Sequence, residues 1–221
     1  MPRIYICLFC FFSYLIQPAY AEPLHARVIN GSFVNPSTYS VAALVTPQGE
    51  LCSGAVISSK AILTAAHCAF IGSRAGAFAY VRGVKYPLAS GKRAPGGLDI
   101  GIVKTAASMK AARFDVPQGI KARVGQRFTL LGFGDPNPGR LVLGYMTIGE
   151  YINSSEFIAV SYRGQNACSG DSGGPAVVNY RGRASIIGVV SRGPQGCRAG
   201  NSVIFPMTTT NYMARWIRQN S

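Results

Sequence analysis

The chain has 221 residues, with 22 Lys and Arg against 8 Asp and Glu, and a formal net charge of +14. This length is about one domain's worth of chain and is enough to bury a core. The basic residues are scattered singly, without a zinc-finger spacing, a basic helix or a basic run with aromatics, which argues against specific nucleic-acid binding. We expect a basic surface with at most weak affinity for polyanions.

The first 21 residues have the layout of a secretory signal peptide. Arg3 supplies the positive charge, residues 4–16 form an apolar core, and Ala19-Tyr20-Ala21 is a small-x-small cleavage site. The apolar run is short for a membrane anchor, which is the alternative, and no later segment is long and apolar enough to cross a bilayer. We therefore expect a secreted protein, extracellular or periplasmic.

A short polar leader, residues 22–27, ends at Arg27 directly before the apolar pair Val28-Ile29. This layout suits a propeptide that is cut after Arg27. An ordinary flexible N-terminus is the alternative, and this stretch alone does not decide between the two.

From Tyr39 onwards, short β-like runs alternate with turn residues. The predicted strands are 39–46, 51–58, 61–66, 77–84, 100–104, 126–133, 141–152, 157–162, 175–180, 186–191 and 202–206. Short strands with Gly and Pro between them predict an all-β sandwich or barrel. No repeat or low-complexity linker marks a second domain.

One α-helix is expected at the C-terminal end, where Thr209 or Thr210 can cap it. Its apolar stripe, read from the helical spacing, is Tyr212, Met213, Trp216 and Ile217.

Four cysteines remain after the signal peptide: Cys52, Cys68, Cys168 and Cys197. An even count in an exported chain argues for two disulfides, and four cysteines permit three pairings. We favour Cys52–Cys68 and Cys168–Cys197, because each pair closes a local loop around a candidate functional segment. Four paired cysteines and one histidine after Arg27 leave no cluster of metal ligands, so we expect no metal and no cofactor.

Ser172 lies in the run Cys168-Ser169-Gly170-Asp171-Ser172-Gly173-Gly174-Pro175. Glycine permits close backbone approach and positive φ. A serine framed in this way can have neighbouring N–H groups pointing into one small space, which a nucleophile with an oxyanion hole requires. The same residue types dominate turns, so the run alone is also compatible with a simple turn.

A nucleophilic serine needs a base and an acid. His67 is the one histidine after Arg27, so no other residue can supply an imidazole to Ser172. Asp99 has apolar neighbours at the start of a predicted strand, and a buried carboxylate needs a hydrogen-bonding partner, which His67 could be. Asp115 and Asp135 fit turn positions better.

With these residues the chain resembles the chymotrypsin/trypsin family of serine proteases over nearly all of residues 28–221. The motifs that carry the resemblance are Val28-Ile29-Asn30-Gly31, Thr64-Ala65-Ala66-His67-Cys68, Asp99-Ile100-Gly101-Ile102-Val103-Lys104, Leu131-Gly132-Phe133-Gly134, Gly170-Asp171-Ser172-Gly173-Gly174-Pro175 and Val190-Ser191-Arg192-Gly193. Phe133 replaces the family's usual Trp, and Arg192 stands where the family usually has an aromatic. The order His, Asp, Ser argues against the subtilisin and α/β-hydrolase arrangements.

The resemblance implies two packed six-stranded Greek-key β-barrels with a C-terminal α-helix and the site in the cleft between the barrels. It implies a secreted serine endopeptidase, acting as a monomer on protein or peptide substrates through an acyl-enzyme. His67, Asp99 and Ser172 would form the triad, and the N–H groups of Gly170 and Ser172 the oxyanion hole. Both favoured disulfides agree with pairs in the family.

The resemblance also gives the leader a role. Cutting after Arg27 would create an amino group on Val28 that folds inward and pairs with Asp171. Because a buried ion pair is costly when one partner is missing, the cut can be coupled to ordering of the oxyanion hole. We expect a zymogen whose residues 28–221 are the protease domain.

In the family, the residue at the place of Asn166 sets primary specificity, and an aspartate there would favour Arg or Lys. Asn166 is neutral, and no Asp or Glu follows Asp171. Ser191, Gly193 and Ser202 are expected to form the walls of the pocket. A one-residue shift of the alignment would place Asn201 on the wall instead of Ser202. We expect poor cleavage after Arg or Lys, a preference for medium-sized uncharged side chains, and activation after Arg27 by another protease.

Two other classes remain open at this stage. One is a catalytically weak basic binding or antimicrobial protein on the same fold, although such relatives usually lose a triad residue and all three are present here. The other is an esterase on the same scaffold, which only peptide substrates would distinguish.

Overall fold

The computed structural model describes residues 28–120, 122–134, 140–193 and 200–221. The expected signal peptide, the leader with Arg27, and Cys197 lie outside the described residues. The strands are β1 (Ser32–Val34), β2 (Val41–Val45), β3 (Leu51–Val56), β4 (Ala61–Thr64), β5 (Phe78–Val81), β6 (Val84–Arg93), β7 (Gly101–Thr105), β8 (Arg127–Gly132), β9 (Leu141–Tyr151), β10 (Glu156–Ser161), β11 (Pro175–Tyr180), β12 (Arg183–Val189) and β13 (Val203–Pro206). The helices are the 3-10 helices η1 (Pro36–Thr38) and η2 (Ala66–Ser73) and the α-helix α1 (Asn211–Asn220).

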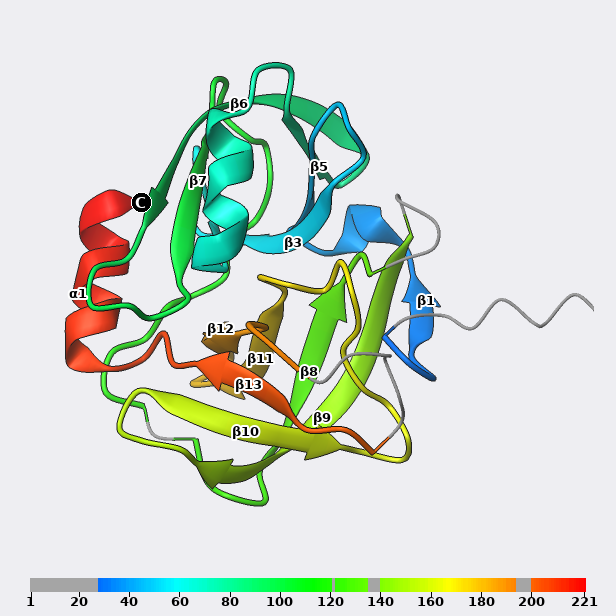
Figure 1. Ribbon diagram of the computed structural model, residues 1–221, viewed down its shortest axis with the longest axis vertical. Coiled ribbons are helices and arrows are strands. Elements are labelled where there is room, and N and C mark those ends of the chain that lie inside the picture. Colours follow the sequence, from blue (N-terminus) through cyan, green and yellow to red (C-terminus); the bar gives the residue numbers. More distant parts are fainter. Residues whose placement is uncertain (1–27, 121, 135–139, 194–199) are drawn as a thin grey trace, which may run out of the picture.

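The first half of the chain closes a barrel in the strand order β2-β3-β4-β7-β6-β5, with antiparallel neighbours (Figure 1). Small and branched apolar side chains fill this barrel, among them Leu44, Ile62, Ile71 and Val103. Their burial is the main favourable term for folding. The barrel fixes the ends of β4 and β7, where two of the expected site residues lie.

The second half forms a sheet in the order β12-β11-β8-β9-β10-β13, with β1 paired to β9. Isolated bridges Gly188–Met207 and Arg192–Ile204 bring its two ends together without a continuous ladder. Its interior holds Phe157 stacked on Phe205, with ring centroids 5.2 Å apart. The expected all-β class with two barrel-like units and a C-terminal helix is confirmed, although the second unit is less completely closed than the first.

Helix α1 begins where the Thr210 hydroxyl accepts a hydrogen bond from the Met213 N–H, as a capping residue does. Met213, Trp216 and Ile217 join a core cluster that contains residues of both halves. The expectation that Tyr212 belongs to this stripe is wrong, because this residue is 58% exposed. In the described part of the chain, no helix has the length and apolar character needed to cross a membrane.

Strand β6 is absent from the predicted strands, although it is one of the longer strands of the first barrel. Pro87 and Gly91 interrupt its sequence pattern, and most of its residues are partly or fully exposed. Only glycine fits at position 91, because a Cβ on Gly91 would lie 1.7 Å from the carbonyl oxygen of Ala69 in η2. β6 therefore supports the helix that carries His67.

Candidate active site

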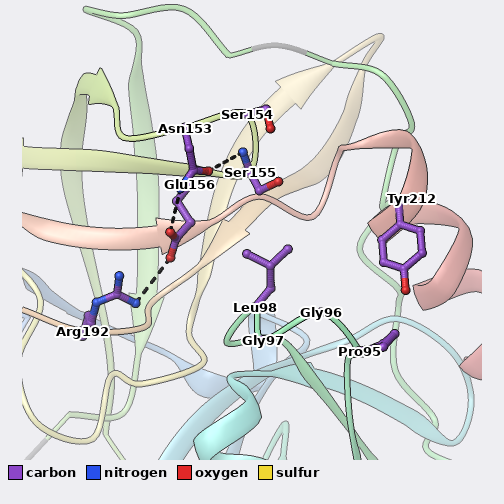
Figure 2. Close-up of a pocket in the computed structure, with 10 residues that line it drawn as sticks. All are labelled: Pro95, Gly96, Gly97, Leu98, Asn153, Ser154, Ser155, Glu156, Arg192 and Tyr212. Atoms are coloured by element: carbon purple, nitrogen blue, oxygen red, sulfur yellow. Dashed lines mark hydrogen bonds and ion pairs between the residues drawn. The ribbon is translucent and has the colours of Figure 1, made fainter.

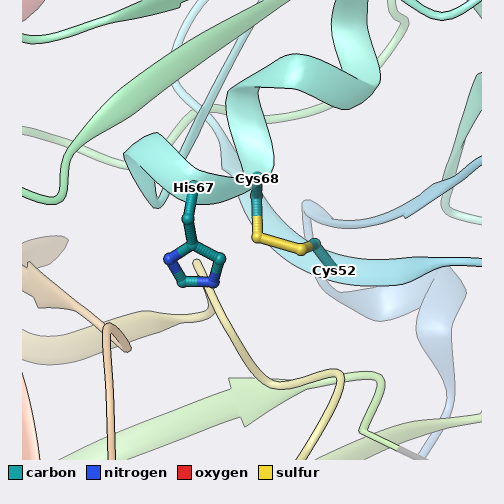
Figure 3. A group of neighbouring side chains, drawn as sticks. All are labelled: Cys52, His67 and Cys68. Atoms are coloured by element: carbon teal, nitrogen blue, oxygen red, sulfur yellow. A yellow bond between two sulfur atoms is a disulfide. The ribbon is translucent and has the colours of Figure 1, made fainter.

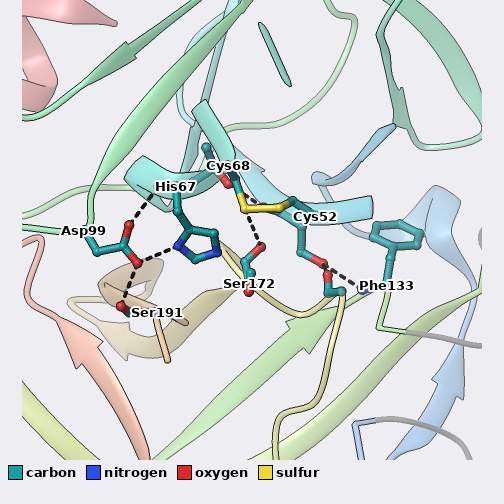
Figure 4. The surroundings of a disulfide bond; sticks show 10 residues. Cys52, His67, Cys68, Asp99, Phe133, Ser172 and Ser191 are labelled. Atoms are coloured by element: carbon teal, nitrogen blue, oxygen red, sulfur yellow. Dashed lines mark hydrogen bonds and ion pairs between the residues drawn. A yellow bond between two sulfur atoms is a disulfide. The ribbon is translucent and has the colours of Figure 1, made fainter. Parts of the chain in front are cut away.

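His67 and Asp99 are brought together by the ends of two neighbouring strands (Figure 4). His67 follows β4 at the start of η2, and Asp99 lies just before β7. The backbone N–H of His67 donates to Asp99 Oδ1 at 2.9 Å, and His67 Nδ1 lies 2.7 Å from Asp99 Oδ2. Two contacts to one carboxylate fix both the position and the orientation of the imidazole, which a general base requires.

A third hydrogen bond reaches the same carboxylate from the second half of the chain. The Ser191 hydroxyl donates to Asp99 Oδ2 at 2.6 Å. Burial opposes ionisation of Asp99, but the hydrogen bonds from His67 and Ser191 outweigh it and lower the pKa of Asp99 to about 2. Asp99 is therefore a carboxylate at neutral pH and can stabilise a protonated imidazole.

Ser172 lies beside the His67 ring, towards the ring nitrogen that does not face Asp99 (Figure 4). The Ser172 carbonyl accepts from the Ser53 N–H at 2.8 Å, which ties the serine loop to the first barrel. The Gly173 N–H donates to the Val190 carbonyl at 2.8 Å, which ties it to the segment leading to Ser191. No direct hydrogen bond joins the Ser172 and His67 side chains among the described contacts, and such bonds commonly tighten only with substrate bound.

Two N–H groups of the serine loop have no acceptor among the described residues. Gly170 has φ +86°, a left-handed conformation that glycine adopts without strain. Neither the Gly170 N–H nor the Ser172 N–H donates to an acceptor within the described part of the chain. The Gly170 carbonyl is turned towards Ser53, whose hydroxyl donates to it at 2.8 Å.

Asp171 is fully buried next to Ser172. Its carboxylate accepts from the Gly134 N–H and the Cys168 N–H, each at 2.9 Å. Burial nevertheless dominates over these two hydrogen bonds and raises the pKa of Asp171 to about 7. None of the ion pairs among the described residues involves Asp171, so its charge is poorly compensated in this form of the chain.

Val28, the residue expected to supply the partner of Asp171, is also fully buried, within the core of the second half. The next residue is held in place by Asn166. The Ile29 N–H donates to the Asn166 carbonyl at 2.8 Å, and the Asn166 N–H donates to the Ile29 carbonyl at 3.3 Å. The segment that follows the expected cut is thus anchored beside the expected specificity pocket.

The expected pocket residues gather in the same region. Asn166 is 1% exposed, and its side-chain amide donates to the Asn201 carbonyl at 2.6 Å. Gly193 packs next to Ser202, since a Cβ on Gly193 would lie 3.6 Å from the Ser202 carbonyl oxygen. Ser191 lies at the other end of this segment, where its hydroxyl faces Asp99.

The cysteines hold this region at two points. The expected Cys52–Cys68 disulfide is confirmed, with Cα atoms 6.2 Å apart, and it lies directly beside His67 (Figure 3). Cys168 is also disulfide-bonded, while Cys197, its expected partner, is outside the described residues.

A profile of the family described as Trypsin matches residues 28–217, almost the whole described chain. The chain belongs to the trypsin family. The match, together with the triad-like geometry, supports a serine protease domain of this family.

Individual relatives agree with the trypsin-family assignment. A protein named Trypsin from Saccharopolyspora erythraea is 25% identical over 221 residues, which cover 84% of this chain and 95% of that protein. CLIP domain-containing serine protease B4 from Anopheles gambiae is 38% identical over 76 residues, and Protein masquerade from Drosophila melanogaster is 25% identical over 254 residues. The last two matches cover only 21% and 24% of those proteins, so the chain spans about a quarter or less of their length.

One residue of this trypsin-family site escaped the sequence prediction. Ser53 is fully buried on β3. Besides its bond to Gly170, its hydroxyl accepts from the Phe133 N–H at 2.8 Å. A serine directly after a predicted disulfide cysteine was the available signal, but its sequence position alone does not show which loops it meets.

One group of potential metal ligands occurs among the described residues. Cys52, His67 and Cys68 have ligand atoms within 4.8 Å of one another (Figure 3). Both sulfurs are consumed by the disulfide, and a cysteine binds metal as a thiolate. The His67 ring is engaged by Asp99. This group therefore lacks the donor chemistry of a metal site.

Proposed function

We propose that the chain is a secreted serine endopeptidase that hydrolyses peptide bonds through the triad Ser172, His67 and Asp99. The observation that carries this proposal is the 2.7 Å contact between His67 Nδ1 and Asp99 Oδ2, with Ser172 on the opposite side of the ring. Asp99 holds the imidazole in one tautomer, so that the ring nitrogen facing Ser172 is free to act as a base.

In the proposed reaction, Ser172 Oγ attacks the scissile carbonyl carbon while His67 Nε2 accepts the hydroxyl proton. The carbonyl oxygen becomes an oxyanion that accepts hydrogen bonds from the Gly170 and Ser172 N–H groups. The C–N bond then breaks, and His67 returns the proton to the departing amine. This leaves an ester on Ser172, which a water molecule hydrolyses by the same sequence, with His67 again as base and then acid.

We further propose that residues 1–21 are a signal peptide, that residues 22–27 are an activation propeptide, and that residues 28–221 are the protease domain. A cut after Arg27 turns the Val28 amide into an ammonium group. The burial of Val28 and Asp171, and the raised pKa of Asp171 in the continuous chain, support an ion pair that forms only after this cut.

For primary specificity, we propose that Asn166, Ser191, Gly193 and Ser202 form an uncharged pocket. The Asn166 amide donates within the protein to Asn201, and no acidic residue follows Asp171 in the chain. Poor cleavage after Arg and Lys follows, so another protease must cut after Arg27. Efficient hydrolysis of arginyl reporter peptides by the cut enzyme would refute this part.

The test of the main proposal is labelling of the cut protein with a fluorophosphonate probe, combined with hydrolysis of a peptide library. Ser172 should be labelled, Ser172→Ala should lose both labelling and hydrolysis, and Ser169→Ala, three residues away, should keep the label. Labelling without peptide hydrolysis would favour the esterase alternative. Absence of both would favour the basic binding or antimicrobial protein.

A further inference from the structure

Figure 2 shows a pocket of about 570 Å³ whose lining includes residues that directly neighbour the proposed site in the sequence. Its walls are residues 95–98, residues 153–156, Arg192 and Tyr212. Leu98 immediately precedes Asp99, and Arg192 immediately follows Ser191, the donor to Asp99. The pocket therefore adjoins the point at which a peptide would be cleaved.

Two charged residues line this pocket, Glu156 and Arg192. They differ in how many of their polar atoms remain available to hydrogen-bond a ligand. The Glu156 side chain is only 14% exposed. Its Oε2 accepts from the Asn153 side-chain amide at 3.0 Å, and its Oε1 accepts from Arg192 Nη1 at 3.4 Å. Both carboxylate oxygens are thus already engaged by the protein, so Glu156 offers little to a basic ligand.

Arg192, in contrast to Glu156, is exposed and makes few side-chain hydrogen bonds. Its side chain is 57% exposed, and the one hydrogen bond that this side chain makes among the described residues is the long contact from Nη1 to Glu156. A guanidinium carries five N–H donors arranged as a rigid fork. Most of these donors remain available at the pocket, and such a fork binds carboxylates in a bidentate manner.

The wall formed by residues 95–98 leaves room for a substrate side chain. Gly96 and Gly97 both adopt positive φ, +80° and +76°, and a Cβ on either would meet nothing within 4 Å. Leu98, on the same wall, supplies an apolar surface for the stem of a long side chain. The pocket thus combines free space, an apolar surface at Leu98 and one cation, Arg192, whose side chain makes a single long hydrogen bond among the described residues.

We propose that this pocket selects substrates that carry an aspartate or glutamate close to the scissile bond, with Arg192 binding the carboxylate. The inference rests on the proposed peptidase function and names a further feature of its substrates. Residues 191–193 run from the triad towards the pocket, and an extended peptide laid along such a segment places alternate side chains on the same side. The acidic side chain is distinct from the residue that enters the Asn166 pocket.

The test uses the cut, full-length enzyme and a series of peptides with one cleavable bond. A single Glu, or Gln as its uncharged match, is placed in turn at each of the four positions on either side of that bond. At one position, kcat/KM for Glu should exceed that for Gln by about two- to fivefold, as expected for a largely exposed ion pair. The ratio should fall as salt is raised.

Variants assign the effect to Arg192. Arg192→Leu should bring the Glu-to-Gln ratio to about one, and Arg192→Glu should invert it. Glu156→Gln should raise the ratio, because it removes the competing carboxylate. Arg181→Leu, which removes the same charge from an exposed turn that does not line the pocket, should keep the ratio of the unaltered enzyme.

Fluorophosphonate labelling of Ser172 in every sample distinguishes failure of the acidic preference from failure of the proposed peptidase function. Hydrolysis with a ratio near one at all positions, or a ratio that survives Arg192→Leu, overturns the acidic preference and leaves the peptidase function standing. Labelled enzyme that cleaves no peptide overturns the proposed function and this inference with it.

Discussion

The hydroxyl of Ser53 donates to the carbonyl of Gly170 at 2.8 Å and so joins the first barrel to the loop that carries Ser172. The same oxygen accepts from the Phe133 N–H at 2.8 Å. The Ser53 backbone N–H also binds the Ser172 carbonyl. One buried serine thus binds two carbonyls of the loop that forms the proposed oxyanion hole, and the Phe133 N–H holds its hydroxyl in place.

Ser53→Ala should lower kcat by about tenfold and leave KM nearly unchanged. The change leaves the Gly170 carbonyl and the Phe133 N–H unpaired, at a cost of about 1–3 kcal/mol per buried group. Part of that cost falls on the orientation of Gly170, which matters in the transition state. Steady-state kinetics that separate kcat from KM, with fluorophosphonate labelling rates, measure the effect.

Ser58→Ala is the matched control for this variant. The Ser58 hydroxyl accepts from the Ala61 N–H at 3.0 Å in a turn between β3 and β4, so its loss should reduce stability without reducing kcat. If Ser53→Ala unfolds at a lower temperature but keeps full kcat, Ser53 only supports the fold.

Asp99→Asn should reduce kcat by about 10⁴-fold, because an amide cannot hold the same imidazole tautomer. The pKa of Asp99, about 2, also predicts the shape of the pH profile of the unaltered enzyme. Asp99 therefore remains ionised throughout the working range and should add no inflection of its own to the pH profile of kcat/KM above about pH 3. An inflection between pH 3 and pH 6 that disappears in Asp99→Asn would contradict the assignment.

Sequence patterns predicted those parts of the site that depend on local motifs. Ser172 and His67 lie in short segments whose glycines and small residues are needed locally, so their chemistry can be read without the fold. Strand β6 could not be predicted in this way, because Pro87 and Gly91 interrupt its pattern and the need for Gly91 appears only when η2 is packed on the strand. The role of Ser53 also depends on two loops, each about 80 or more residues away in the chain.

Ser191→Ala should reduce kcat/KM by about fivefold, the size of one hydrogen bond of about 1 kcal/mol. The Ser191 hydroxyl helps to keep Asp99 ionised, so the effect should depend on the carboxylate. A double-mutant cycle measures this dependence. In the Asp99→Asn background, Ser191→Ala should cost little, and a full fivefold loss there would show that Ser191 acts on the substrate and not through Asp99.

The uncut precursor should lose stability as pH rises from 5 to 8, because of Asp171. The pKa of Asp171 in the folded chain is about 7, above its ordinary value of 3.8. A group whose pKa is raised by folding contributes stability that is complete below its unfolded pKa and is lost as pH rises through the folded value. The loss attributable to Asp171 should be on the order of 2 kcal/mol across this range.

Thermal unfolding of an uncleavable precursor, Arg27→Gln, with and without Asp171→Asn, measures this loss. Asp171→Asn lowers stability at every pH, because its single amide oxygen can accept from only one of the Gly134 and Cys168 N–H groups and its NH2 group would face the other. The pH dependence of this variant should be flatter. If the Val28 ammonium pairs with Asp171 after the cut, as we propose, the same pH interval should no longer destabilise the cut protein. Equal pH dependence in cut and uncut forms would rule out Val28 as the partner of Asp171 and remove the proposed link between the cut and activity.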